Sequence, residues 1–198
     1  NQIHKVNIGS TKKINTNQII SKKILNSKAK NKDLICLVLA DGNEKECVQM
    51  LLFAKNVAEE NPNVSFIFRA HPIINIKLLL KRNPVLKKYN ANISWSSEPL
   101  ESEYTKSHLV FYRGTNAIFG AASYGVQPVF IERNGFMSDP LSDLDGERLK
   151  IKETNEFKGI ISFLYSKNND KLINLISSYC NKKYNELDVY PLIKILSS

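Results

Sequence analysis

The sequence predicts an α/β protein built on one doubly wound, Rossmann-like parallel sheet, with strand order 3-2-1-4-5 and room for a sixth strand. From residue 34 to residue 131, short apolar runs alternate with segments whose apolar residues recur at helical spacing. The first run, residues 34–40, is almost continuously apolar, which is typical of a parallel strand covered on both faces. Right-handed crossovers between such strands then give the doubly wound order.

The strands and helices alternate along most of the chain. The expected strands are residues 34–40, 64–70, 93–97, 109–112, 127–131 and a short last one at 148–153. The expected helices are residues 46–60, 74–86 and 100–107, one between residues 116 and 125, and two C-terminal helices at 157–165 and 172–184. The second helix is interrupted or ends near Pro84, and Gly125 ends the fourth, in the place of a C′ glycine.

Local signals support the individual elements. Residues 46–60 carry apolar side chains at i, i+3 and i+4 spacing, which indicates one buried helix face. Pro72 directly follows a strand and suits the first turn of a helix. Thr115 or Asn116 can cap the helix that Gly125 ends.

Composition restricts the class of protein. A chain of 198 residues with 42% apolar residues can form one domain with a proper core. No apolar run approaches the length of a membrane span, and the N-terminal residues lack the apolar segment of a signal peptide. Cys36 lies in an apolar run and Cys47 on the apolar side of a helix, so both are expected to be buried, reduced thiols, which fits a cytoplasmic location. No Cys/His spacing indicates a zinc site.

The net charge of +9 is concentrated at one end of the chain. Residues 1–32 contain eight lysines and no acidic residue, whereas bases and acids nearly balance in residues 33–198. We expect residues 1–32 to be a basic arm or interdomain linker and residues 33–198 to be the compact domain. Such an arm is either a solvated linker or a contact for an anionic membrane or a phosphorylated ligand. A nucleic-acid partner is disfavoured, because the arm has no arginine and no aromatic residue.

Three of the strands lead into sharp turns. Asp41-Gly42 follows the first strand, Arg69-Ala70-His71-Pro72 ends the second, and Arg113-Gly114-Thr115-Asn116 follows the fourth. In the predicted order a crevice opens between the first and fourth strands, where the strand order reverses. The turns should therefore meet at one edge of the sheet. Their backbone N–H groups and cationic side chains suit a phosphate-bearing ligand, the alternative being an ordinary βαβ crossover with a plain helix cap.

Four side chains near these turns are candidate functional residues. His71 can donate to a phosphate oxygen or act as a proton donor, and its alternative is a local hydrogen bond. Arg113, at the turn itself, and Arg69 can add charge-assisted contacts, although Arg69 could instead pair with a neighbouring helix. Glu98 either binds a ribose or sugar hydroxyl or is a solvated loop carboxylate. The absence of a P-loop, of GxGxxG after the first strand and of a nucleophile elbow argues against NTPases, dehydrogenases and α/β-hydrolases.

Three stretches resemble a known family. They are Phe68-Arg-Ala-His-Pro72, Ser107-His-Leu-Val-Phe-Tyr-Arg-Gly-Thr-Asn116 and Ala121-Ala-Ser-Tyr-Gly-Val-Gln-Pro-Val-Phe-Ile131. Together they resemble the C-terminal, donor-binding half of GT-B-fold glycosyltransferases, above all bacterial capsule and lipopolysaccharide transferases of the polysialyltransferase and Kdo-transferase groups, with glycerophosphotransferases nearby. The family shows a His-Pro pair after a strand and a small polar turn before a glycine-ended helix. Many members carry a Glu where this chain has Gly120.

The resemblance implies a single GT-B half that binds a nucleotide-activated sugar, a CMP-linked one among the candidates, for bacterial surface polysaccharide or lipopolysaccharide synthesis. It implies His71 as the catalytic group and the turn residues as the donor site, with the nucleotide sugar as substrate and no cofactor or metal. The glycan acceptor would bind an N-terminal domain that this chain does not contain, and the enzyme would work in the cytoplasm or at the inner membrane. Two alternatives stay open: a polyol-phosphate transferase with a CDP-glycerol-type donor, and a non-catalytic α/β binding domain, which Gly120 favours.

Overall fold

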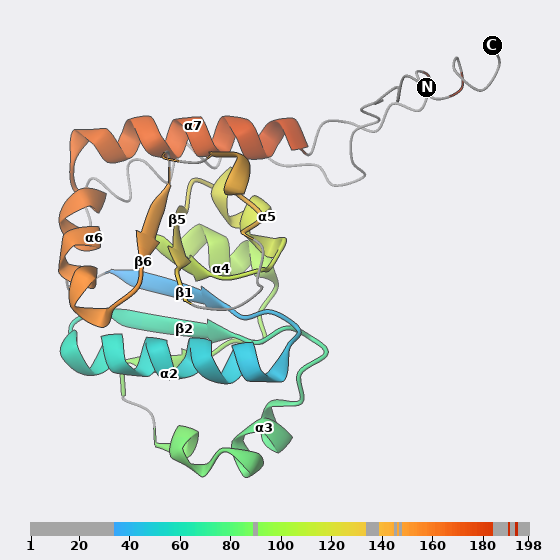
Figure 1. The fold of residues 1–198 in the computed structure, drawn as a ribbon, viewed down its shortest axis with the longest axis vertical. Helices are drawn as coiled ribbons and strands as arrows, with labels where there is room; N and C mark the ends of the chain where they lie inside the picture. The colour runs from blue at the N-terminus through green and yellow to red at the C-terminus, as the bar shows by residue number, and fades with distance from the viewer. Residues whose placement is uncertain are drawn as a thin grey trace.

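The computed structural model describes residues 34–88, 91–133, 139–144, 146, 148–183, 190 and 193. Within them, parallel strands form one six-stranded sheet in the order β3-β2-β1-β4-β5-β6 (Figure 1). The strands are β1 (Ile35–Leu39), β2 (Ser65–Arg69), β3 (Ile93–Trp95), β4 (Leu109–Tyr112), β5 (Gln127–Ile131) and β6 (Leu149–Ile151). The predicted doubly wound order is confirmed, and the sixth strand is present. The predictions for residues 1–32 lie outside the described residues.

Helices cover both faces of the sheet, and Figure 1 shows α2 and α7 on opposite sides of it. One layer consists of α2 (Glu44–Glu60), α3 (Ile76–Arg82) and α6 (Phe157–Leu164); the other consists of α4 (Leu100–Lys106), α5 (Ala117–Ser123) and α7 (Lys167–Lys183). Alternate strand residues serve the two layers: Cys36 and Val38 belong to the core under the first, and Leu37 and Leu39 to the core under the second. Both faces of the sheet are therefore buried, as the continuous apolar strands predict.

Helix boundaries depart from the predictions where capping residues decide them. α2 begins at Glu44, earlier than predicted, because the side chain of Asn43 accepts hydrogen bonds from the backbone N–H groups of Lys45 and Glu46. α3 gives way to the 3₁₀ helix η2 (Pro84–Lys87), so the predicted interruption near Pro84 is confirmed. α7 begins at Lys167 rather than at residue 172, because its first turn is polar and adds nothing to the apolar period.

The end of α5 has the predicted glycine. Gly125 has φ 77°, and its N–H donates to the carbonyl of Ala122 at 2.9 Å. The N–H of Val126 donates to the carbonyl of Ala121 at 3.1 Å. These two bonds form a Schellman motif, in which a glycine adopts the left-handed conformation at no steric cost.

The thiol side chains lie where the apolar pattern puts them. Cys36 and Cys47 are fully buried, as predicted, and Cys180 is buried as well. Among the described residues, no helix has the length and apolar character needed to cross a bilayer.

Candidate functional site

Three strands end level with one another at the carboxyl edge of the sheet. Leu39, the last residue of β1, is in register with Arg69 of β2 and with Tyr112 of β4. The N–H of Ala40 then donates to the carbonyl of Arg69 at 3.1 Å, which keeps the first two turns side by side. The turns after β1, β2 and β4 therefore meet at one edge, as the sequence predicts.

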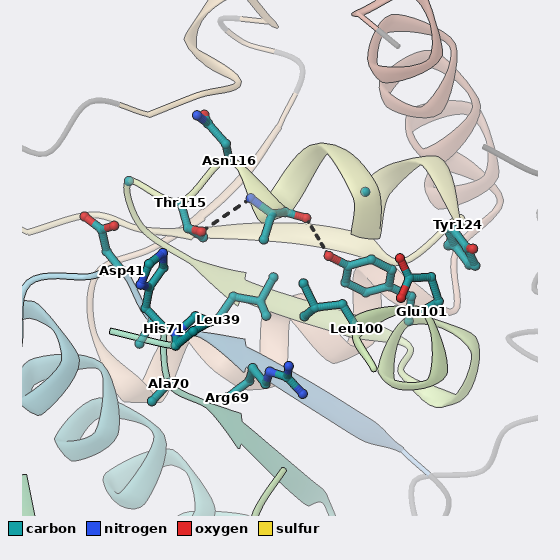
Figure 2. Close-up of a pocket in the computed structure, with 16 residues that line it drawn as sticks. Leu39, Asp41, Arg69, Ala70, His71, Leu100, Glu101, Thr115, Asn116 and Tyr124 are labelled. Carbon is teal, nitrogen blue, oxygen red and sulfur yellow. Dashed lines mark hydrogen bonds between the residues drawn. The ribbon is translucent and has the colours of Figure 1, made fainter. Parts of the chain in front are cut away.

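A pocket of about 610 Å³ opens at this edge (Figure 2). Its volume lies in the range of small-molecule sites, roughly 300–1,000 Å³. The predicted site residues in its lining are Asp41, Arg69, His71, Gly114, Thr115 and Asn116. The rest of the wall comes from the end of β1, the turns after β1 and β2, and α4 and α5. The pocket thus lies where strand order reverses, between β1 and β4.

His71 is an exposed side chain at the pocket, held by its Nδ1 atom. The N–H of Ile73 donates to Nδ1 at 3.3 Å. With Nδ1 an acceptor, the neutral imidazole carries its proton on Nε2, which remains able to donate to a ligand. Gly42 lies against the ring: a Cβ there would come within 3.4 Å of Nδ1 and 3.3 Å of Ile73 Cγ2. Gly42 therefore contributes close packing beside His71.

The helix predicted from residue 74, with Pro72 suited to its first turn, begins later in the structure. Pro72 lies in a turn, and α3 begins only at Ile76, capped by the side chain of Asn75, which accepts from the N–H of Leu78 at 3.2 Å. Asn75 supplies a side-chain oxygen that can cap the helix, which Pro72 cannot, so α3 begins directly after Asn75. Within the described residues, the helices whose first turns line the pocket are α4 and α5.

The turn after β4 presents backbone donors to the pocket. Gly114 has φ 74°, which bends the chain sharply. Of the two predicted caps, Thr115 provides the bond: its Oγ1 accepts from the N–H of Ala117 at 3.3 Å, while the amide of Asn116 stays exposed at the pocket mouth. In the described part of the chain, the backbone N–H groups of Gly114, Thr115 and Asn116 have no hydrogen-bond partner. Such successive N–H groups form an anion-binding turn.

The Arg113 side chain does not reach the pocket, which corrects the expectation from its position. It is only 2% exposed; its Nε lies 3.4 Å from Glu46 Oε2 in an ion pair, and its Nη2 donates to the carbonyl of Arg133 at 3.2 Å. Side chains alternate along a strand. Because Tyr112 belongs to the core under α4, α5 and α7, the next side chain points to the opposite layer, where α2 supplies Glu46.

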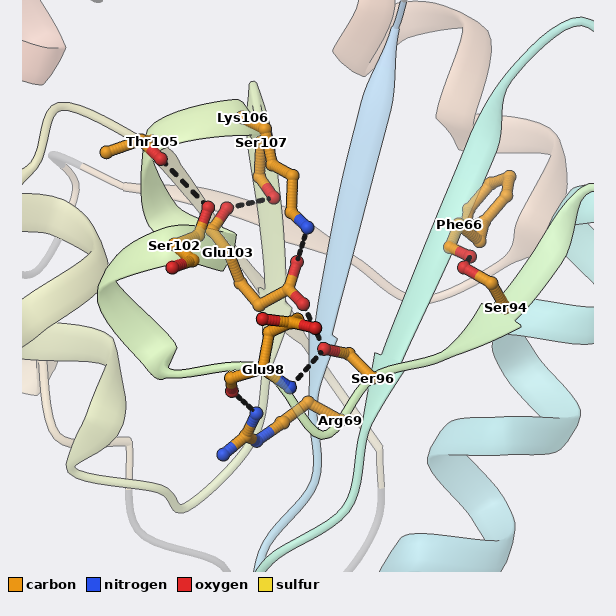
Figure 3. A network of polar contacts seen from close by, with 10 residues as sticks. All are labelled: Phe66, Arg69, Ser94, Ser96, Glu98, Ser102, Glu103, Thr105, Lys106 and Ser107. Atoms are coloured by element: carbon orange, nitrogen blue, oxygen red, sulfur yellow. Dashed lines mark hydrogen bonds and ion pairs between the residues drawn. The ribbon is translucent and has the colours of Figure 1, made fainter.

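Arg69 and Glu98 interact in a way that the sequence did not indicate. Arg69 lines the pocket, and its Nη1 donates to the backbone carbonyl of Glu98 rather than to a helix carboxylate (Figure 3). Glu98 has an exposed side chain that is not part of the pocket wall, and its N–H donates to Ser96 Oγ at 3.1 Å. The expectation that the Glu98 carboxylate contacts a ligand is therefore corrected: its backbone holds Arg69.

Glu101, Tyr104 and Tyr124 form a part of the pocket wall that sequence reasoning missed. The Tyr104 hydroxyl donates to the carbonyl of Ala117 at 3.0 Å, and its ring lies against Gly120. The only sequence signal is that Leu100 and Tyr104 are spaced i, i+4 and so share a helix face. Among the described residues, no group of three His, Cys, Asp or Glu side chains could hold a metal ion.

Comparison with known proteins identifies structures of similar fold but assigns the sequence to no family. No family model matches the sequence, and the search of curated proteins found no match. The glycotransferase of kitacinnamycin superposes with a TM-score of 0.58 at 8% identity, over 86% of this chain and 44% of that one. The C-terminal CMP-Kdo binding domain of WaaA from Acinetobacter baumannii gives 0.51 at 11% identity, over 85% of this chain and 100% of that one.

The wall teichoic acid polymerase TagF, carrying H444N and soaked with CDPG, gives a TM-score of 0.50 at 12% identity, over 87% of this chain and 41% of that one. The chain therefore spans less than half the length of the kitacinnamycin enzyme and of TagF, and the whole of the WaaA domain. At these identities the likeness establishes the fold alone: an α/β, Rossmann-like sheet matching that of GT-B glycosyltransferases.

Proposed function

We propose that this chain is the donor-binding half of a glycosyltransferase that uses a nucleotide-activated sugar. The observation that carries the proposal is the pocket at the β1–β4 crevice, which has unlike ends. One end offers His71 and the backbone N–H groups of the Gly114–Asn116 turn, which suit a phosphate. The other end is walled by Leu100, Tyr104 and Tyr124, whose apolar and aromatic surfaces suit a nucleoside.

The arrangement gives each group near the phosphate a role. Glycosyl transfer leaves negative charge on the departing nucleotide phosphate, and donors already aimed at that charge lower the barrier. His71 Nε2–H and the turn N–H groups would supply these donors, and Arg69, which also lines the pocket, adds a positive charge. Asp41, whose Oδ1 accepts from the N–H of Gly42 at 2.7 Å, lies beside His71 in the pocket wall.

The finer assignments extend the same proposal. A CMP-linked sugar is favoured by the likeness to the CMP-Kdo binding domain of WaaA, since the match covers the whole length of that domain. The acceptor glycan and the catalytic base would lie on a second domain, with residues 1–32 as linker and as a lysine-rich contact for the inner membrane. The product would be a bacterial surface polysaccharide or lipopolysaccharide made in the cytoplasm.

The likeness to TagF favours one alternative, transfer of a polyol phosphate from a CDP-linked donor. Both reactions need the same phosphate-binding end of the pocket, so the His71 contacts do not separate them. Incubating the protein with CMP-linked sugars and with CDP-glycerol, and measuring binding of each, would separate them. A non-catalytic α/β binding or interaction domain is the remaining alternative; Gly120 favours it, and saturable nucleotide binding would argue against it.

Titration of the 198-residue chain with CMP, CDP, UDP and GDP, followed by calorimetry and NMR shift mapping, tests the proposal. We expect saturable binding with shifts at His71 and residues 114–117. His71→Ala should weaken binding about ten-fold or more, because a charge-assisted contact contributes roughly 1.5–3 kcal/mol. His71→Gln, which keeps a donor near the Nε2 position, should retain more affinity than His71→Asn.

Thr115→Val should cost less than His71→Ala, because the backbone donors of the turn remain. Thr105→Val is the matched control: Thr105 is an exposed residue of α4 outside the pocket, and its Oγ1 donates to the carbonyl of Ser102 at 2.8 Å. Unchanged affinity in His71→Ala, shifts confined to other surfaces, or no binding at millimolar nucleotide would each contradict the proposal.

A further inference from the structure

We infer that Glu101 is a recognition residue of the pocket, a carboxylate that accepts hydrogen bonds from the vicinal ribose hydroxyls of the bound nucleotide. The inference rests on the proposed function, since it takes the ligand to be a nucleotide with its phosphate at the His71 end. It adds the residue that reads the ribose and a preference for ribonucleotides over their deoxy analogues.

Glu101 lies in the first turn of α4 and lines the same pocket as His71 and Thr115. Figure 2 shows it beside Tyr124, at the end of the pocket opposite His71. The Glu101 carboxylate is close enough to act on Tyr124: the pKa of the Tyr124 hydroxyl is raised mainly by burial and, to a smaller extent, by the negative charge of Glu101. A nucleotide with its phosphate at the turn therefore extends its nucleoside toward Glu101.

The Glu101 carboxylate is available to a ligand, in contrast to its neighbour Glu103. In the described part of the chain, no hydrogen bond or ion pair engages the Glu101 side chain. Glu103 is 1% exposed, accepts from Ser96 Oγ and pairs with Lys106 Nζ at 3.1 Å (Figure 3). Glu103 thus ties α4 to the loop after β3, and this contact fixes the helix that carries Glu101.

The facing helix α5 cannot supply this carboxylate. Its residues in the pocket wall are Ala117 and Gly120, and a Cβ at Gly120 would lie 3.0 Å from Tyr104 Cε2 and 3.1 Å from its hydroxyl oxygen. The same hydroxyl is held by the carbonyl of Ala117 at 3.0 Å, so the ring stays over α5. Among the described residues of the pocket wall, the carboxylates are Asp41, at the His71 end, and Glu101 of α4. Glu101 is therefore the carboxylate placed to accept from ligand hydroxyls at the opposite end.

A carboxylate suits a vicinal diol because its two oxygens accept from two neighbouring hydroxyls in charge-assisted bonds. Acidic residues bind ribose hydroxyls in this way in dinucleotide-binding folds. A site built on such bonds discriminates strongly against an analogue that lacks the hydroxyls. Charge alone would act in the opposite direction, because Glu101 is an anion near an anionic ligand.

The test compares CMP with 2′,3′-dideoxycytidine monophosphate in the intact chain and in the variants Glu101→Gln and Glu98→Gln. We expect the unmodified chain to bind CMP at least about ten-fold more tightly than the dideoxy compound, and Glu101→Gln to lose most of that preference by weakening CMP alone. Glu98→Gln removes a nearby exposed carboxylate outside the pocket and should leave both affinities unchanged. Unchanged urea midpoints show that both variants are folded.

Two results would overturn the inference. In one, Glu101→Gln leaves the CMP preference intact; in the other, it strengthens binding of both compounds, which is the signature of charge repulsion alone. If CMP binds and depends on His71 but not on Glu101, the proposed function stands and this inference fails. If CMP does not bind the unmodified chain, both fail together.

Discussion

Charged side chains around the pocket divide into those that hold the fold and those that face a ligand. Arg113 and Glu46 pair with each other below the turn, with side chains 2% and 15% exposed. Glu103 pairs with Lys106 and is equally buried. His71 and Glu101 are instead exposed at the pocket. Burial, rather than position in the sequence, separates the two groups, since a buried charge needs a partner within the protein.

Glu46→Gln should destabilise the protein by roughly 3 kcal/mol, because the buried Arg113 guanidinium would lose its anionic partner. Urea unfolding measures this. Glu44→Gln is a control on the same helix: Glu44 Oε2 pairs with Arg82 Nη1 at 3.0 Å, but the two side chains are 44% and 64% exposed. That exposed pair should contribute no more than about 1 kcal/mol.

The Glu46→Gln variant should also keep its nucleotide affinity, since Arg113 is not part of the pocket wall. Equal losses of stability in Glu46→Gln and Glu44→Gln would contradict the buried pair. A loss of affinity without a loss of stability would return Arg113 to the site.

The sequence could not have given the direction of Arg113. All four residues of β4 are buried and apolar or aromatic, so the strand shows no alternation from which an inward and an outward face can be told apart. The position of the turn was predictable, because glycine and small polar residues follow the strand. Which layer Arg113 joins depends on α2, which supplies Glu46 from the other side of the sheet.

At the scale of elements, the pocket wall depends on close contact between α4 and α5. Tyr104 of α4 lies over Gly120 of α5 and bonds the carbonyl of Ala117. Gly120 is thus a packing residue, because it leaves room for the aromatic ring.

Gly120→Ala should destabilise the protein by about 1–2 kcal/mol, because the added methyl group would force the Tyr104 ring aside. Gly159→Ala is a matched control in α6, where a Cβ would have no atom within 4 Å. There the substitution should stabilise by roughly 0.5–1 kcal/mol through the better helix propensity of alanine. Urea midpoints of the two variants should move in opposite directions; two stabilised variants would show that the ring does not pack on Gly120.

Element order was predictable because apolar runs, glycines and prolines mark strands and stops locally. The start of α3 was predicted at residue 74, whereas the helix begins at Ile76. Pro72 and Asn75 are both compatible with a helix start, and the turn between them determines which one is used. The part of the wall formed by Glu101 was not predictable either. Helical spacing places Leu100 and Tyr104 on one face, but not the edge of the sheet toward which that face points.

At the scale of the whole molecule, ionisable groups are distributed through both core layers. Cys36 of β1 and Cys47 of α2 lie in one layer, and Tyr112 of β4 in the other, all with no exposed surface. Burial, with a smaller contribution from Glu44, raises the pKa of Cys47 to about 11. Burial also raises the pKa of Cys36 and, together with Asp139, that of Tyr112. In alkaline solution, these three buried groups therefore stay protonated in the native protein when they have already ionised in the unfolded chain.

This difference predicts that stability falls in alkaline solution. Below about pH 8.5, the ordinary pKa of a thiol, both states keep these protons and stability does not depend on them. Above it the unfolded chain binds fewer protons than the native protein, so the free energy of unfolding should fall by about 1.4 kcal/mol per pH unit for each of Cys36 and Cys47. The contribution of Cys47 should end near pH 11, where the native thiol also ionises.

Urea unfolding at pH 7, 8, 9 and 10 under a reducing agent measures how steeply the free energy of unfolding falls with pH. Between pH 9 and 10, Cys47→Ala should make the fall in the free energy of unfolding less steep by about 1.4 kcal/mol per pH unit, the contribution of one buried thiol. This change in slope does not depend on the effect of the substitution on stability at pH 7. Identical slopes in the two proteins, or rapid reaction of Cys47 with a thiol reagent in the native state at pH 8, would contradict a buried thiol with a raised pKa.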